Sequence, residues 1–341
     1  MSRTLVVTND FPPRRGGIET FVRQLCDELP PEQVVVHTAR MPGQAEYDAA
    51  LPFPVVRDPS SVLLPTPGVG RRVAATLRRH GCDRVVFGAS APLGLLASRL
   101  RAAGATSLVA LTHGHEVWWA RTPVARQLLR RIGDSVDELT YVSEYCRVRI
   151  APALSAEAAA RMRLLTPTVD RARFRPGCGG AEVRRRLGIA ADALVVVCVA
   201  RLVRRKGQDT LVRIWPELLE SFPDAVLLLV GDGPDRRRLD RMVARRGVGA
   251  SVLRVGSVPW EEVPAYLDAG DVFAMPVRTR RLGLEVEAFG IVYLEAAACG
   301  LRVVGGGSGG AGEAVALAGA ELRRKADRAP QQAEGPEPVS G

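Results

Sequence analysis

Short apolar segments alternate with longer segments of helical spacing along most of this chain, in two successive runs. In the first run we expect strands at residues 4–8, 34–36, 84–87, 107–111, 138–142 and 163–165, with helices at 18–29, 68–80, 92–103, 122–132 and from 144. In the second run we expect strands at 194–199, 225–230, 252–256, 271–275 and just before 305, with helices from 210, after 231–234, at 260–267 and at 291–299. This alternation predicts an α/β protein with parallel sheets covered by helices. Ligands of such sheets bind beyond the carboxyl ends of the strands, so we look for a site in the loops that follow strands.

A segment without periodicity separates the two runs. Residues 166–176 contain two prolines, and 177–180 read Gly-Cys-Gly-Gly. We therefore predict an N-terminal domain at 1–165, a linker at 166–180 and a C-terminal domain at 181–315. A short helix is possible at 314–326, but residues 327–341 are rich in Pro, Gln, Glu and Gly, and we assign 316–341 to a disordered tail.

The charge of the chain limits its partners. Lys and Arg number 47 against 37 Asp and Glu, for a net charge of +10, and the surplus is almost all arginine. A basic surplus suits nucleic acid, an anionic membrane or phosphorylated substrates. The arginines are scattered and no nucleic-acid-binding motif accompanies them, so we expect no nucleic-acid partner. Several expected helices of the first run combine arginines with an apolar face, which suits an anionic membrane surface.

Compartment and metal content follow from short motifs. The apolar run at 5–7 is too short for a secretory signal, and the longest apolar run, 193–200, is too short to span a bilayer. The six cysteines lack paired spacing, so we expect reduced thiols in the cytoplasm. No H-E-x-x-H or C-x-x-C motif is present, so we expect no metal and no cofactor.

The stretch from Glu287 to Glu295 carries the most chemistry. Gly290 lets the backbone approach a ligand where a helix begins, and Phe289 precedes it. The next amides, at Ile291, Val292 and Tyr293, are first-turn donors that attract phosphate. Glu295 can then accept hydrogen bonds from vicinal hydroxyls, and Glu287 can reach another part of the same ligand. Two carboxylates around such a helix start suit a nucleotide bound to a sugar; the alternative is a buried strand–helix unit with two solvated glutamates.

Two loops of the first run are further candidates. Gly16 and Gly17 precede the first helix, so their amides can face a phosphate, although a tight turn would look the same. His115 lies just past the strand at 107–111, where a residue that contacts ligand is expected, although a structural histidine bonded to backbone is the alternative.

Two loops of the second run complete the set. Arg201 and Lys206 flank the loop after the strand at 194–199, where they can hold a diphosphate from two sides; a solvated basic loop is the alternative. Ser257 and Val258 follow the strand at 252–256 and can meet a nucleotide base.

Taken together, these residues resemble a retaining glycosyltransferase of family four with the GT-B fold. The paired glycines, the histidine, the Arg–Lys pair and the two glutamates separated by seven residues occur in the family's order, and the resemblance covers about residues 3–313. Segments 8–17, 112–116 and 204–209 are similar to actinobacterial mannosyltransferases that use GDP-mannose to mannosylate phosphatidylinositol mannosides. The resemblance implies two Rossmann-like domains that face a central cleft.

The resemblance also implies roles for the residues. Arg201 and Lys206 would neutralise the donor diphosphate in place of a metal, Glu295 would hold the ribose, Glu287 would contact the sugar, and His115 would lie by its reacting face. The implied catalytic residues are His115, Arg201, Lys206 and Glu287. The implied donor-binding residues are Gly16, Gly17, Arg201, Lys206, Ser257, Val258, Phe289, Gly290, Ile291, Val292 and Glu295. The departing phosphate would help to deprotonate the acceptor, so no dedicated base is expected.

The implied function is transfer of mannose from GDP-mannose to a phosphatidylinositol mannoside-type lipid, by an enzyme peripheral to the inner face of the cell membrane. The chain departs from the family after the glycine-rich segment 305–313, because family members continue for several more elements; we therefore expect a second domain that is incomplete at its C-terminus. Two alternatives stay open. One is a glycosyltransferase with another nucleotide sugar and another glycolipid or small-molecule acceptor, and the other is an inactive GT-B fold that only binds.

Overall fold

The computed structural model describes residues 2–14 and 16–328, which divide into two compact units. Unit 1 comprises the chain up to Thr168 together with Thr279–Phe289. Unit 2 comprises Val169–Arg278 and the chain from Gly290 onward. Among the described residues, no helix is both long and apolar enough to cross a membrane.

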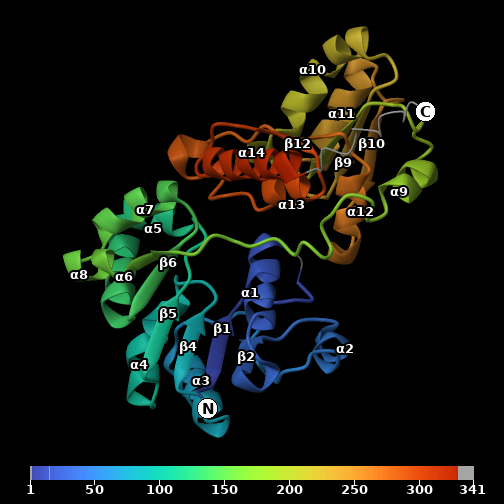
Figure 1. The fold of residues 1–341 in the computed structure, drawn as a ribbon. Coiled ribbons are helices and arrows are strands. Elements are labelled where there is room, and N and C mark those ends of the chain that lie inside the picture. The colour runs from blue at the N-terminus through green and yellow to red at the C-terminus, as the bar shows by residue number, and fades with distance from the viewer. Residues whose placement is uncertain (1, 15, 329–341) are drawn as a thin grey trace, which may run out of the picture. The chain divides into compact units, whose positions relative to one another are not determined.

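Unit 1 is built on a parallel sheet of seven strands in its described residues, in the order β3-β2-β1-β4-β5-β6-β7 (Figure 1). The strands are β1 Thr4–Thr8, β2 Val34–Ala39, β3 Val55–Asp58, β4 Arg84–Phe87, β5 Ser107–Ala110, β6 Glu138–Tyr141 and β7 Met162–Leu164. The α-helices are α1 Gly17–Asp27, α2 Gln44–Ala49, α3 Pro67–Arg79, α4 Ala97–Ala102, α5 Glu116–Arg121, α6 Pro123–Ser135, α7 Glu144–Ile150 and α8 Ala156–Ala160. Short 3-10 turns occupy Pro31–Gln33, Leu93–Leu96, Ala151–Ala153 and, in the returning segment, Arg281–Gly283.

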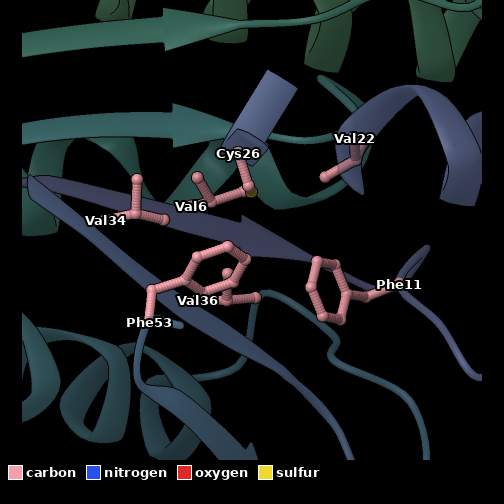
Figure 2. Packing of buried hydrophobic residues seen from close by; sticks show 7 residues of the cluster. All are labelled: Val6, Phe11, Val22, Cys26, Val34, Val36 and Phe53. Carbon is pink, nitrogen blue, oxygen red and sulfur yellow. The ribbon is translucent and has the colours of Figure 1, made fainter. Parts of the chain in front are cut away.

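The core of unit 1 surrounds β1, whose five residues are all buried. Successive side chains of a strand point to opposite faces, so both faces of the sheet are covered at β1, and this explains its nearly continuous apolar sequence. Figure 2 shows part of this core, where side chains from β1, α1 and β2 pack with two phenylalanines of the connecting loops. The cluster comprises Val6, Phe11, Val22, Cys26, Val34, Val36 and Phe53.

Unit 2 has a parallel sheet of five strands in its described residues, in the order β10-β9-β8-β11-β12. The strands are β8 Val195–Val199, β9 Val226–Val230, β10 Val252–Gly256, β11 Val272–Met275 and β12 Arg302–Gly305. The α-helices are α9 Gly180–Leu187, α10 Gln208–Ser221, α11 Arg236–Arg246, α12 Val263–Asp268, α13 Val292–Ala298 and α14 Ala311–Arg328, with 3-10 turns at Arg204–Lys206 and Trp260–Glu262. The two parallel sheets confirm the expected α/β class.

The sequence pattern does not predict β3, α2, α5, α8 or α9. These elements are short; α9 is the longest of them, with 8 residues. A helix of two turns or fewer shows too little of its repeat to stand out from a loop.

The short helix considered at 314–326 is present and longer than expected, so the disordered tail expected from residue 316 is wrong as far as residue 328. Helix α14 starts at Ala311, continues to Arg328, and packs on α13 and β12. Its start buries Ala311, Ala314 and Ala318, and alanine is the residue that favours helix most. The rest of that expected tail, residues 329–341, lies outside the described residues.

Candidate functional site

The expected site residues follow strand ends in both units, and each unit is described by itself. Unit 1 contains the residues of the first domain and the first part of the glutamate stretch: Gly16, Gly17, His115, Glu287 and Phe289. Unit 2 contains the others: Arg201, Lys206, Ser257, Val258, Gly290, Ile291, Val292 and Glu295.

The loop after β1 is shaped by a glutamate that the sequence pattern does not single out. Helix α1 begins at Gly17, and a Cβ at Gly16 would lie 2.2 Å from Glu19 Oε2, so a side chain at position 16 would displace that carboxylate. Burial raises the pKa of Glu19, although its own backbone amide and Arg14, which pairs with it at 3.0 Å, act in the opposite direction. The carboxyl group of Glu19 therefore lies beside the loop whose amides, at Gly16 and Gly17, were expected to face a phosphate.

His115 is held by backbone and by a buried carboxylate. Its Nε2 lies 3.1 Å from the carbonyl oxygen of Ala91 and 3.2 Å from Glu116 Oε1. A carbonyl oxygen only accepts, so Nε2 is the donor to Ala91, and Nδ1 takes part in neither of these two contacts. The side chain remains partly exposed. The structural interpretation of His115 is thus compatible with a role in binding, because these two contacts use only one ring nitrogen.

Glu116 organises the loop that carries His115. Its side chain is fully buried, accepts a hydrogen bond from Ser90 Oγ at 2.7 Å, and accepts another from the His113 amide at 3.1 Å. The sequence could have pointed to Glu116, because this residue directly follows the Thr-His-Gly-His segment at 112–115. These hydrogen bonds hold the loop in place, because a buried carboxylate without donors would cost roughly several kcal/mol.

The segment that carries Glu287 packs on this histidine loop within unit 1. Ser143 Oγ donates to the Ala288 carbonyl at 2.7 Å, and Glu287 and Phe289 are both buried. A Cβ at Gly114, whose φ is +98°, would lie 2.3 Å from the Ala288 Cβ, so only glycine fits there. The structure therefore brings together the backbone segments that carry two expected catalytic residues, because His115 follows Gly114 and Glu287 precedes Ala288.

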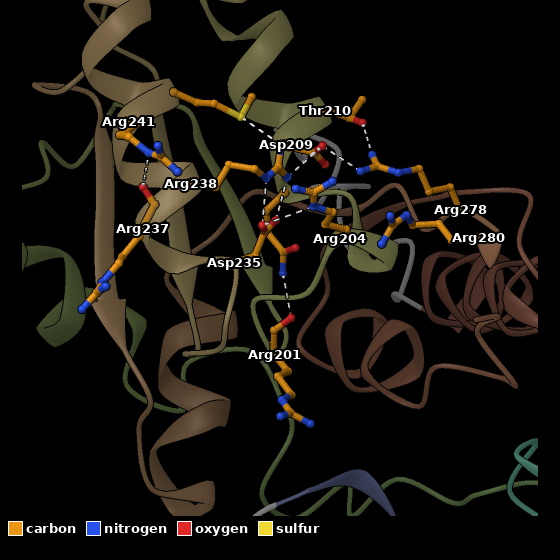
Figure 3. A network of polar contacts seen from close by, with 12 residues as sticks. Arg201, Arg204, Asp209, Thr210, Asp235, Arg237, Arg238, Arg241, Arg278 and Arg280 are labelled. Atoms are coloured by element: carbon orange, nitrogen blue, oxygen red, sulfur yellow. Dashed lines mark hydrogen bonds and ion pairs between the residues drawn. The ribbon is translucent and has the colours of Figure 1, made fainter. Parts of the chain in front are cut away.

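In unit 2, the loop that carries Arg201 and Lys206 is anchored at both ends. Gln208 Nε2 donates to the Arg201 carbonyl at 3.2 Å, and the Arg278 amide donates to the Arg205 carbonyl at 2.9 Å. Gly207, with φ +83°, is so close to Pro276 that a Cβ would lie 2.1 Å from the Pro276 carbonyl oxygen. The Arg201 guanidinium points away from the cluster around Asp209 in Figure 3.

Asp209 is the centre of that cluster. Its buried Oδ2 lies 2.7 Å from Arg278 Nη2 and 3.0 Å from Arg238 Nη2, and Arg238 also pairs with Asp235 at 2.6 Å. Burial acts to raise the pKa of Asp209, but the hydrogen bonds from Arg278 and Arg238 outweigh it and hold the pKa below its ordinary value. The cluster therefore links the start of α10 to α11 and to the loop that follows β11.

Replacing Asp209 with asparagine should lower the free energy of unfolding at pH 7 by about 2 kcal/mol, because both arginines lose their carboxylate partner. The pKa of Asp209 is lowered in the fold, so its stabilising contribution is present above its ordinary pKa and is lost as the pH falls through the lower value. Urea unfolding at pH 7 measures the difference. The matched control is Asp240→Asn, whose pair with Arg254 at 2.9 Å is exposed and should contribute little; equal losses in both variants would contradict the role of Asp209.

Glu295 lies inside α13 and is almost completely buried. Burial raises the pKa of its carboxyl group to about 7. The turn before α13 contains Gly290 at φ +88°, and the Tyr293 amide donates to the Gly290 carbonyl at 3.0 Å. The Tyr293 amide is therefore engaged, contrary to the expectation of a free first-turn donor.

The base-contact candidates lie at the end of β10. Ser257 is exposed and Val258 is half-buried, directly after Gly256. Within the described residues, no group of three or more His, Cys, Asp and Glu side chains is arranged to hold a metal ion.

Comparison with known proteins shows which class of protein has this sequence pattern and this fold. A family described as "Glycosyltransferase Family 4" matches residues 15–173, and one described as "Glycosyl transferases group 1" matches residues 181–322. Among solved structures, Anabaena HepE in complex with UDP and glucose aligns with a TM-score of 0.74 at 19% identity, over 95% of this chain and 90% of that one. Sucrose-phosphate synthase from Thermosynechococcus elongatus aligns with a TM-score of 0.72 at 22% identity, over 95% and 90%. The fold is that of the GT-B glycosyltransferases.

Relatives with higher sequence identity identify a group within this class. The chain is 48% identical to the GDP-mannose-dependent alpha-(1-6)-phosphatidylinositol monomannoside mannosyltransferase of Mycolicibacterium smegmatis, over 91% of this chain and 82% of the relative. It is 43% identical to the GDP-mannose-dependent monoacylated alpha-(1-6)-phosphatidylinositol monomannoside mannosyltransferase of Corynebacterium glutamicum, over 92% and 82%. The chain therefore belongs to the family-four glycosyltransferases, in the group that includes these actinobacterial mannosyltransferases, which confirms the resemblance read from the sequence.

Proposed function

We propose that this protein transfers mannose from GDP-mannose, with retention of configuration, to a phosphatidylinositol mannoside-type lipid. The observation that carries the proposal is the 48% identity, over 91% of the chain, to a mannosyltransferase named for that donor and that class of acceptor.

In this proposal Arg201 and Lys206 neutralise the donor diphosphate, and no metal or cofactor takes part. The anchored loop around them supports this role, because cations fixed in place before the reaction need little reorganisation as charge develops on the leaving group. Arginine and lysine supply complementary contacts, a planar fork and a point charge.

Further residues would recognise the rest of the donor. The Glu295 carboxylate would accept hydrogen bonds from the ribose hydroxyls, and Ser257 and Val258 would contact the base. Phe289, the turn at Gly290 with the amides of Ile291 and Val292, and the Gly16–Gly17 loop would border the phosphates and the sugar. The proximity of the His115 and Glu287 loops supports a shared role for these two side chains at the mannose.

We further propose that the protein binds peripherally to the anionic inner face of the cell membrane. We propose no nucleic-acid partner. Helices α3, α6 and α7 carry arginines, as expected. Two of these form ion pairs within unit 1, because Arg72 pairs with Asp58 at 2.7 Å and Arg147 pairs with Glu144. The remaining arginines of these helices would supply the attraction, each worth about 1 kcal/mol near an anionic surface.

Calorimetric titration with GDP-mannose, beside UDP-glucose, tests the donor assignment. We expect saturable binding of GDP-mannose and weaker or no binding of UDP-glucose. Transfer of labelled mannose to a phosphatidylinositol mannoside in vesicles then tests the acceptor. Preference for UDP-glucose would replace the donor, and donor binding without transfer to any lipid or small-molecule acceptor would favour a protein that only binds.

A further inference from the structure

The segment that returns from unit 2 to pack in unit 1, residues 279–289, begins with a tight, closed loop at residues 280–285. Arg280 and Glu285 form an antiparallel bridge, with the Arg280 amide 2.9 Å from the Glu285 carbonyl and the Glu285 amide 3.2 Å from the Arg280 carbonyl. The Glu285 carboxylate also pairs with Arg280 at 3.2 Å and with Arg281 at 3.0 Å. The loop is thus held by its own backbone and by one shared carboxylate.

The tip of this loop presents an apolar side chain in an unfavourable backbone conformation. Leu282 is 93% exposed, and its φ of 53° and ψ of 36° lie in the left-handed region, as does the φ of 50° at Arg281. Glycine or asparagine adopts this conformation more easily than a bulky residue. A leucine here costs backbone strain and exposes apolar surface, so stability of the free protein does not explain it.

The tip is fixed to helix α5, where more apolar side chains are exposed. Arg121, the last residue of α5, donates from Nη1 to the Leu282 carbonyl at 2.7 Å. A Cβ at Gly283 would lie 2.6 Å from that same nitrogen, so the guanidinium packs directly on the loop. The exposed large apolar residues on the loop, on α5 and at the start of α6 are Trp118, Val124, Leu282 and Leu284, which we call the apolar rim.

Cations accompany the apolar rim. Arg121 is exposed, and the Arg281 side chain remains largely exposed beside Leu282 despite its pair with Glu285. Apolar tips bordered by arginines suit the boundary between lipid headgroups and acyl chains, where the apolar part enters and the cations remain with phosphates. A second copy of this chain would bring the same arginines together, so charge complementarity favours an anionic lipid surface over self-association.

We propose that the apolar rim inserts into an anionic bilayer, with Leu282 and Leu284 among the acyl chains and Arg121 and Arg281 at the lipid phosphates. The proposal deepens the proposed function and rests on it, because a lipid acceptor would be reached from the bilayer. It places the contact on a preformed loop, whereas the sequence pattern suggested only the basic helices.

Substituting Leu282→Asn tests the proposal without disturbing the fold, because asparagine tolerates the left-handed conformation. We expect the wild-type chain to sediment with vesicles containing phosphatidylglycerol more than with neutral phosphatidylcholine vesicles, and the variant to bind the anionic vesicles about tenfold more weakly. The matched control is Leu164→Asn, a leucine of β7 in the same unit that is 57% exposed and lies outside the apolar rim, and its vesicle binding should equal that of wild type.

Two further measurements separate the possible outcomes. Titration with GDP-mannose should give the same affinity for Leu282→Asn and wild type; loss of donor binding in both, with vesicle binding retained, would sink the proposed donor but not the lipid contact. Unchanged vesicle binding of Leu282→Asn, or no vesicle binding by wild type, would overturn the inference. A concentration-dependent dimer that Leu282→Asn abolishes, with vesicle binding intact, would assign the apolar rim to a second copy of the chain.

Discussion

Replacing Lys206 with alanine should reduce kcat/KM for mannose transfer by roughly 1000-fold while the protein stays folded. In the proposed role this ammonium group stabilises the diphosphate as its charge develops, and a fixed donor of this kind typically contributes two to three orders of magnitude, roughly, to the rate. Steady-state transfer of labelled mannose, beside thermal unfolding of the same samples, measures both quantities. Lys206→Arg should recover only part of the rate, because a planar guanidinium does not reproduce a point charge at the same place.

The control for this experiment is Arg246→Ala. Arg246 is an exposed cation in the last turn of α11, in the same unit, and the substitution removes one positive charge without touching the loop after β8. Its transfer rate should stay within about twofold of wild type, since a solvated charge contributes little. Equal losses in the two variants would indicate a general effect of net charge, and full activity of Lys206→Ala would remove the lysine from the site.

The fold could be predicted where a strand contains a run of aliphatic residues. The expected bounds 84–87 and 252–256 agree with β4 and β10, and 4–8 agrees with β1. Strand β1 is buried throughout inside its sheet, and the edge strand β10 has Val252, Leu253 and Val255 around Arg254, so each shows an apolar run in the sequence. Strand β3 has four residues and only one of them fully buried, which leaves no such run.

The site could be predicted only as far as local rules extend. Strand ends pointed to the loops of Lys206 and His115, because ligands gather at one edge of a parallel sheet. No local pattern could show that residues 279–289 pack in unit 1, because that depends on contacts between distant residues such as Gly114 and Ala288. The bond between Arg121 and Leu282 spans 161 positions and is equally invisible to periodicity.

Replacing Glu295 with glutamine should stabilise the fold at pH 8 and weaken donor binding. Burial raises the pKa of Glu295 to about 7 from the usual 4.5, so the folded state holds this proton more tightly than the unfolded state. The associated stability is complete below pH 4.5 and is lost as the pH rises through about 7, a total of about 3 kcal/mol. Glutamine stays neutral, so the variant should match wild type near pH 5 and exceed it by up to that amount at pH 8.

Donor affinity should move in the opposite direction. The ribose diol would donate to an ionised Glu295, so wild-type affinity for GDP-mannose should rise as the pH passes about 7, and Glu295→Gln should lose this rise and bind at least tenfold more weakly at pH 8. Thermal unfolding and calorimetric titration, each at pH 5 and pH 8, measure the two effects. A site that retains a buried carboxylate at a cost in stability is expected where function needs the charge. If Glu295→Gln had the same stability and the same affinity for GDP-mannose as wild type at pH 8, the Glu295 carboxyl group would neither ionise in the folded protein nor contact the donor.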